Sequence, residues 1–287
     1  MSTAVVTGSR GLLGATLMRT LPEAGFRAVA LTGDIRDAAA VAKQIAQAAP
    51  AHVVHTAAMT DVAACERQPQ EAFAVNGEGT KNVVAAARAA GACILYVSTA
   101  SVFRGDRGDC READTPEPIN AYNQSKREGE RHTLDYDGGM VLRLNLIGIH
   151  PDGSRGKNFI EWLLDDFRAN KDMTLFADVC INPLSNWTIA ALIAKILVRD
   201  RLEKILHIGS RDVLSKAAIG ELARARFPGY RGALQAGSVD AIADGVFRPK
   251  QMWLNTDKAA ALCGPMSVVA QELDTIFARS SQLVPLG

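Results

Sequence analysis

The chain lacks features that several classes of protein require. Its five cysteines are odd in number and have no Cys-x-x-Cys spacing, which argues against a disulfide framework and a zinc site. Its five histidines have no metal-binding spacing either. The net charge is only +1, with acidic and basic residues mixed along the chain, and no apolar run approaches the length of a bilayer span. We therefore expect no metal, no nucleic-acid surface and no membrane, and, because the N-terminus has no signal-like region, a cytoplasmic protein.

Apolar segments are abundant: 48% of the 287 residues are hydrophobic, enough for a large core. In the first half, short apolar runs at 4–6, 28–31, 53–56, 94–97 and 140–144 alternate with helical patterns near 12–21, 38–48 and 69–90. Such alternation is typical of a parallel sheet with helices on both faces. We predict an α/β fold: a Rossmann-type doubly wound parallel sheet over residues 1–150, and a smaller C-terminal substrate-binding lobe over residues 151–287, with some chain exchange between the two.

A glycine-rich motif follows the first apolar run directly. Gly8, Gly11 and Gly14 are spaced Gly-x-x-Gly-x-x-Gly before a helical pattern, one residue wider than the common dinucleotide fingerprint. Glycines there let phosphates approach the backbone N–H groups and the positive end of a helix. The alternative is that they only shape a tight turn. The cofactor-binding residues predicted from this motif are Gly8, Ser9, Arg10, Gly11, Leu12, Leu13 and Gly14.

A second motif can move a proton. Tyr122 and Lys126 are four residues apart, so on a helix they share one face, where the lysine can also reach a nicotinamide ribose. A nearby ammonium stabilises the phenolate, and we expect it to lower the pKa of Tyr122. Tyr122 could then protonate a carbonyl oxygen as hydride arrives. Thr99, at the end of the 94–97 run, would hydrogen-bond the same oxygen. Taken alone, the pair could be an ordinary helix surface contact.

Together these stretches resemble the extended short-chain dehydrogenase/reductase family, and within it most the dTDP-4-dehydrorhamnose reductases. The resemblance runs from about residue 3 to 264 and is carried by residues 6–14, 55–62, 74–76, 96–103 and 122–126, with weaker support at 158–159 and 248–258. It implies that Thr99, Tyr122 and Lys126 are catalytic. It also implies that Ala57 and Ala58 line the cofactor, and that Asp34 and Ile35 lie near its adenine.

The chain departs from that subfamily where the sugar is expected. Ala100 replaces the usual acidic residue, Met59 an aromatic residue, and Leu146 a tryptophan. A nucleotide-linked 4-keto-6-deoxysugar is therefore an expectation from the family. Each candidate for substrate contact could equally be a solvated loop residue; they are Ala100, Asp61, Asn145, Arg155, Lys157 and Asn158.

The second predicted strand ends without a carboxylate until Asp34, while Arg10 projects from the glycine turn. A guanidinium can grip a 2′-phosphate in bidentate fashion, so NADP(H) is favoured over NAD(H). The alternative is that Arg10 is a surface charge and Asp34 reaches the ribose itself.

Three functions are consistent with these residues. The first is an NADPH-dependent reductase of a nucleotide-linked 4-keto-6-deoxysugar, with Tyr122 as proton donor. The second is a nucleotide-sugar epimerase of the same fold, and the third a non-catalytic, cofactor-binding regulatory subunit. A homodimer is possible if the alanine-rich helix at 82–90 packs against a partner; packing on the sheet is the alternative.

Overall fold

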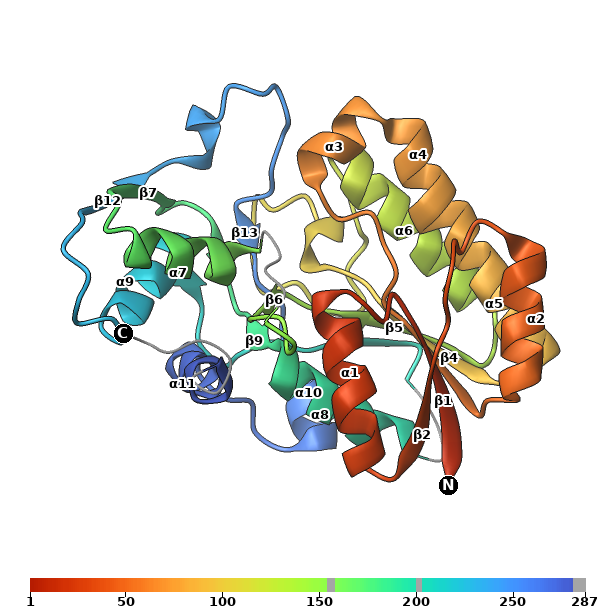
Figure 1. Cartoon of the computed structure of the whole chain (residues 1–287). Helices are drawn as coiled ribbons and strands as arrows, with labels where there is room; N and C mark the ends of the chain where they lie inside the picture. The colour runs from red at the N-terminus through yellow and green to blue at the C-terminus, as the bar shows by residue number, and fades with distance from the viewer. Residues whose placement is uncertain (154–157, 200–202, 281–287) are drawn as a thin grey trace.

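A six-stranded parallel sheet forms the centre of the computed structural model, which describes residues 1–153, 158–199 and 203–280 (Figure 1). Its strand order is β10-β5-β4-β3-β1-β2, and every neighbouring pair is parallel. The strands are β1 (Ser2–Thr7), β2 (Phe26–Ala30), β3 (His52–His55), β4 (Cys93–Val97), β5 (Gly139–Arg143) and β10 (Ile205–His207). The predicted Rossmann-type fold class is thus confirmed. The edge strand β10 comes from the second half of the chain.

Helices cover both faces of this sheet because successive strand residues point to opposite sides. Val6 packs with Leu17 and Ile193 against α1 (Leu12–Glu23) and α8 (Asn186–Leu197). Val5 packs with Ile45 on the other face, toward α2 (Ala38–Ala48) and α5 (Thr80–Ala89). The apolar side of α5 is buried in this second core. The structure therefore shows the alanine-rich helix packed within its own chain.

The helix expected over 69–90 is divided in three. It consists of α4 (Pro69–Phe73), the π-helical turn η1 (Ala74–Gly79) and α5. A Cβ on Gly79 would lie 2.7 Å from Ile35 Cγ1, so the chain passes close to the loop that follows β2 here. Such π turns frequently occur at functional sites. This one directs Asn76 at the Met59 backbone, accepting from its N–H at 2.8 Å and donating to its carbonyl at 3.0 Å.

A second group of elements builds a smaller lobe beside the carboxyl ends of the strands (Figure 1). Its core includes Leu163, Phe167, Leu175, Ile219 and Leu273. Its main elements are α7 (Phe159–Arg168), β7 (Met173–Phe176), α9 (Lys216–Arg224), β12 (Leu234–Gly237) and α11 (Val269–Ser280). Helix α6 (Ala121–Leu134) packs against β4 and β5 of the large sheet, and α10 (Asp257–Cys263) packs against β10. The other elements are β6 (Leu146–Ile147), β8 (Cys180–Ile181), β9 (Leu184–Ser185), β11 (Leu214–Ser215), β13 (Gln251–Met252), α3 (Val62–Arg67), η2 (Ala100–Val102) and η3 (Val239–Ala241).

Across the described part of the chain, no helix has both the length and the hydropathy needed to cross a bilayer.

Candidate active site

A cavity of about 600 Å³ opens at the carboxyl ends of β1, β2 and β3. It is lined by Gly8, Ser9, Arg10, Gly11, Leu31, Thr32, Gly33, Asp34, Ile35, Thr56, Ala57, Ala58 and Val75. Ligands of open α/β sheets bind in this position. The structure therefore brings together the glycine turn, the Asp34-Ile35 pair and the Ala57-Ala58 pair that the sequence analysis assigned to the cofactor.

The turn requires its glycines because backbone segments meet there. Gly8 has φ +64°, and a Cβ on it would lie 2.7 Å from Ala57 N; a Cβ on Gly14 would lie 2.1 Å from Gly8 O. Thr7 Oγ1 accepts hydrogen bonds from Thr56 N and Ala57 N, both at 3.1 Å, and so joins β1 to β3 beneath the turn. No side chain caps α1 at Gly11, and its first turn holds no acidic residue. This backbone cradle fits the pyrophosphate of a dinucleotide.

A second cavity, of about 420 Å³, shares Gly11, Thr56 and Ala58 with the first. Its lining is Gly11, Leu12, Leu13, Gly14, Thr56, Ala58, Thr60, Val97, Ser98, Thr99, Tyr122, Lys126, Leu144, Asn145, Leu146 and Asn158. Thr99, Tyr122 and Lys126 thus lie around one space, continuous with the glycine turn. A cofactor and a small substrate can meet there.

Tyr122 and Lys126 are carried by α6, whose first turn is capped by Asn120. The Asn120 side chain accepts from Asn123 N at 2.9 Å and donates to Phe247 O at 2.9 Å. This ties the helix start to the loop of the smaller lobe. Since an asparagine cap satisfies an otherwise unpaired N–H group, it fixes the position of Tyr122 two residues on.

The phenol of Tyr122 remains protonated at neutral pH. Burial raises its pKa to about 12, and the hydrogen bond with Thr99 only partly opposes this. The expectation that Lys126 would lower the pKa of Tyr122 is therefore wrong for this structure. Lys126 Nζ instead donates to Val97 O at 2.8 Å and lies 4.1 Å from the centre of the Tyr96 ring. A phenol that keeps its proton suits a proton donor.

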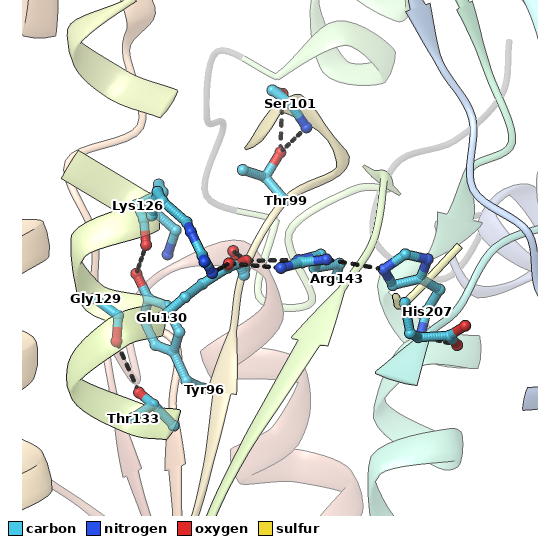
Figure 2. A network of polar contacts seen from close by, with 12 residues as sticks. Tyr96, Thr99, Ser101, Lys126, Gly129, Glu130, Thr133, Arg143 and His207 are labelled. Carbon is cyan, nitrogen blue, oxygen red and sulfur yellow. Dashed lines mark hydrogen bonds and ion pairs between the residues drawn. The ribbon is translucent and has the colours of Figure 1, made fainter. Parts of the chain in front are cut away.

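Lys126 is itself buried, and burial lowers the pKa of its ammonium to about 7, with the charge of Glu130 opposing the shift. Glu130 belongs to a buried polar network that the sequence analysis missed (Figure 2). Its carboxylate faces Arg143 on β5, and Arg143 reaches His207 on β10. The available signal was the i,i+4 spacing of Glu130 from Lys126, together with an arginine in an apolar strand.

His55, below the glycine turn, is also buried, and burial lowers its pKa to about 3, assisted by the charge of Lys126. Because Thr80 Oγ1 already donates to Asn76 O, it accepts from His55 Nε2 at 2.9 Å, and Thr7 Oγ1 donates to Nδ1 at 2.6 Å. This neutral imidazole therefore has a structural role, joining β3 to β1 and α5.

The part of the first cavity beside Asp34 holds an ion-pair chain that sequence reasoning also missed. Arg36 Nε donates to Asp34 Oδ2 at 2.8 Å, and its Nη1 to Glu71 at 2.7 Å. Hydrogen bonds from Arg36 lower the pKa of Asp34. The carboxylate of Asp34 is therefore already occupied by a guanidinium, while Arg10 lines the same cavity.

The candidates for substrate contact do not all reach the site. Asn145 and Asn158 line the second cavity. Asp61 is outside its lining, and its carboxylate caps α3 by accepting from Ala64 N at 2.8 Å. Ala100 is 1% exposed and packs in a core cluster with Val102 and Phe103, so its side chain is not available to a substrate. Two further candidates, Arg155 and Lys157, lie outside the described residues.

The two lining asparagines are held by the smaller lobe. Asn145 Nδ2 donates to Met252 O at 2.6 Å, and Asn158 Oδ1 caps α7 by accepting from Ile160 N at 3.0 Å. Their partners thus come from β13 and α7. The position of the lobe sets the position of both amides.

A doubly wound parallel sheet, a glycine turn after β1, and a helix carrying Tyr122 and Lys126 beside a strand-end threonine define a Rossmann-type protein of the extended short-chain dehydrogenase/reductase class. More specifically, the chain belongs to the RmlD substrate binding domain family, whose model matches residues 2–279.

Some of the similar proteins carry reductase names, and others are named methionine adenosyltransferase 2 subunit beta. The chain is 38% identical over 180 residues to a dTDP-4-dehydrorhamnose reductase of Streptomyces griseus, covering 61% of this chain and 58% of that protein. It is 30% identical over 268 residues to a dTDP-4-keto-6-deoxy-D-glucose reductase of Streptomyces niveus, covering 88% of each. The crystal structure of dTDP-4-dehydrorhamnose reductase from Bacillus anthracis in complex with NADP superposes with a TM-score of 0.88 at 23% identity, covering 96% of this chain and 99% of that one.

Proposed function

We propose that this protein is an NADPH-dependent reductase of a nucleotide-linked 4-keto-6-deoxysugar, with Tyr122 as the proton donor. The observation that carries the proposal is the placement of Tyr122 with Thr99 and Lys126 around a cavity that continues into the glycine-turn cleft. The reductase names of the Streptomyces relatives support the reaction class and the sugar.

Each residue of the site has its own role in the proposed reaction. A bound nicotinamide supplies the hydride to the carbonyl carbon. Tyr122 donates its phenolic proton to the carbonyl oxygen, whose negative charge grows as the new C–H bond forms. Thr99 holds that oxygen by a hydrogen bond, and the Lys126 ammonium stabilises the phenolate that remains. Lys126 is buried and Tyr122 is partly buried in the cavity wall, and this reduced exposure strengthens each of these interactions.

NADP(H) fits the charges at the adenosine end better than NAD(H). Arg10 faces the cavity, and the Asp34 carboxylate is neutralised by Arg36. A carboxylate paired in this way is a poor acceptor for a ribose 2′-hydroxyl, whereas free guanidinium donors suit a 2′-phosphate. The NADP found in the Bacillus anthracis structure supports the same choice. NAD(H) is the alternative.

The nucleotide carrier has a suitable space beside the sugar. Next to Asn158, a cavity of about 290 Å³ is lined by Phe159, Trp162, Thr174, Leu175, Phe176 and Lys216. The Lys216 ammonium lies 5.6 Å from the Phe159 ring and 5.8 Å from the Phe176 ring. Aromatic faces stack on a nucleobase, and a buried ammonium attracts phosphate. The location supports a nucleotide-linked sugar over a free one.

The test is a binding titration with NADPH and NADH, followed by absorbance at the reduced-nicotinamide band after adding dTDP-4-keto-6-deoxyglucose. Loss of absorbance with NADPH as the preferred cofactor supports the proposal. Product formation without net cofactor oxidation would instead indicate the epimerase. Cofactor binding with no turnover across a panel of nucleotide sugars would indicate a regulatory subunit. An assembly measurement by light scattering tests the possible homodimer.

A further inference from the structure

Glu130 is a fully buried carboxylate, one helical turn beyond Lys126 on α6. Its Oε1 accepts from Ser98 Oγ at 2.6 Å and from Arg143 Nε at 2.8 Å. Its Oε2 accepts from Arg143 Nη2 and Arg127 Nη1, both at 2.8 Å. The four contacts occupy both oxygens, so the carboxylate is held rigidly (Figure 2).

The hydrogen bond to Ser98 links Glu130 to the reacting groups. Ser98 directly follows β4, between two residues of the site. Val97 O accepts from the Lys126 ammonium at 2.8 Å, and Thr99 lies with Tyr122 in the cavity wall. A carboxylate that holds Ser98 therefore holds the strand end that places both neighbours.

The positive charges that face the Glu130 carboxylate come from two elements, α6 and β5. Cations face the carboxylate from α6, with Lys126 and Arg127, and from β5, with Arg143. Beyond Arg143, His207 of β10 donates from Nδ1 to Cys110 O, so its Nε2 accepts from Arg143 at 3.2 Å and the ring is neutral. Burial keeps the pKa of His207 near 3.

The other titratable groups facing Lys126 and His207 do not replace Glu130. His55 of β3 is neutral, and burial raises the pKa of Tyr96, on β4, well above its usual value. Glu112 accepts from His207 N at 3.1 Å, on the far side of Arg143. The negative charge that acts on Lys126 is therefore that of Glu130.

We propose that Glu130 is a positioning residue for this active site: its carboxylate fixes the Val97–Thr99 strand end through Ser98 and supplies the negative charge that keeps Lys126 protonated during turnover. This inference rests on the proposed reductase function. It assigns a role to a residue that lines neither of the two cavities described above.

The test is Glu130→Gln, which keeps the shape and removes the charge. The readout is kcat/KM for NADPH as a function of pH, which reports the groups of the free enzyme. We expect the basic limb of the profile to move to lower pH by about one unit, with a loss of about tenfold at pH 8. Glu128→Gln is the matched control, because Glu128 lies on the same helix in a partly exposed pair with Arg131, and its profile should match wild type.

An unshifted profile for Glu130→Gln, or an equal loss at every pH, would overturn the charge role. Ser98→Ala separates the second role, since it keeps the charge and removes only the link to the strand end. It should lower kcat without moving the profile, and an unchanged kcat would overturn the positioning role.

Two readouts keep the inference independent of other failures. If Glu130→Gln does not fold, Glu130→Asp replaces it, because the shorter side chain retains the charge but cannot reach Ser98 and Arg143 together. This variant should lower kcat without moving the pH profile of kcat/KM. A kcat equal to that of wild type would overturn the inference. The pH dependence of the NADPH Kd needs no sugar. If wild type binds NADPH but reduces no sugar, the proposed function fails, while a downward shift of this binding profile in Glu130→Gln still supports the inference and an unshifted profile overturns it.

Discussion

Lys126→Met should make the fold more stable at neutral pH while it removes turnover. Burial lowers the pKa of Lys126 from 10.5 to about 7, so between these values the unfolded chain binds more protons than the folded one. Stability of the wild type therefore rises with pH across this window. The penalty for burying the ammonium is fully present below pH 7 and is lost as pH rises through 10.5.

The size of the effect follows from the two pKa values. The penalty is ~4 kcal/mol at pH 7 and ~2 kcal/mol at pH 9. Methionine removes it, but also loses the hydrogen bond to Val97 O, which costs ~2 kcal/mol for a charged donor and ~1 kcal/mol for the neutral amine present at pH 9. We expect Lys126→Met to exceed wild type by ~2 kcal/mol at pH 7 and by ~1 kcal/mol at pH 9.

The assay is urea unfolding of both proteins at pH 7 and pH 9, with the difference in unfolding free energy as the result. Lys81→Met is the control, because Lys81 is an exposed lysine paired with Glu78; its difference from wild type should be the same at both pH values. A Lys126→Met difference that is also independent of pH would refute the reasoning.

Three further substitutions test the site. Tyr122→Phe deletes the proton donor and should lower kcat by about 10²- to 10⁴-fold while leaving the NADPH Kd within about twofold; stopped-flow absorbance and fluorescence titration measure the two. Arg10→Ala should raise the NADPH Kd by about tenfold and the NADH Kd far less if the guanidinium grips a 2′-phosphate, and equal losses in paired titrations would defeat that assignment. Gly14→Ala places a Cβ 2.1 Å from Gly8 O and should weaken NADPH binding and lower Tm, whereas Gly229→Ala, with nothing within 4 Å, should change neither in calorimetry and titration.

The sheet and its glycine turn were predictable because their signals are local. The alternation of apolar runs with helical patterns limits the number of possible strand orders. The glycine turn between β1 and α1 can be recognised from neighbouring residues alone. The predicted run at 140–144 corresponds to β5, which begins one residue earlier and ends one earlier. Strand β10 could not be placed, since three residues, Ile205–His207, carry too short a pattern.

The arrangement of the polar groups in the site could not be predicted, because it depends on which side chains are buried in the folded chain. The spacing of Tyr122 and Lys126 predicts one helix face, and both side chains do line one cavity. The spacing does not predict that the Lys126 ammonium donates to Val97 O. It also does not predict that burial decides the direction in which the pKa of Tyr122 shifts. Asp61 and Ala100 were chosen by position in the family pattern, but helix capping and core packing occupy them.

The unfavourable burial of Lys126 bears on whether the chain is an enzyme or a binding subunit. An ammonium with its pKa near 7 weakens the fold at neutral pH, and such costs are typical of active sites, where stability and activity trade against each other. A subunit that only held NADPH by its pyrophosphate would gain stability from Lys126→Met and lose little affinity, because the glycine turn supplies that contact through backbone N–H groups. In a reductase the same variant would gain stability and lose turnover. Measuring unfolding, NADPH affinity and turnover on this one variant therefore separates the two functions.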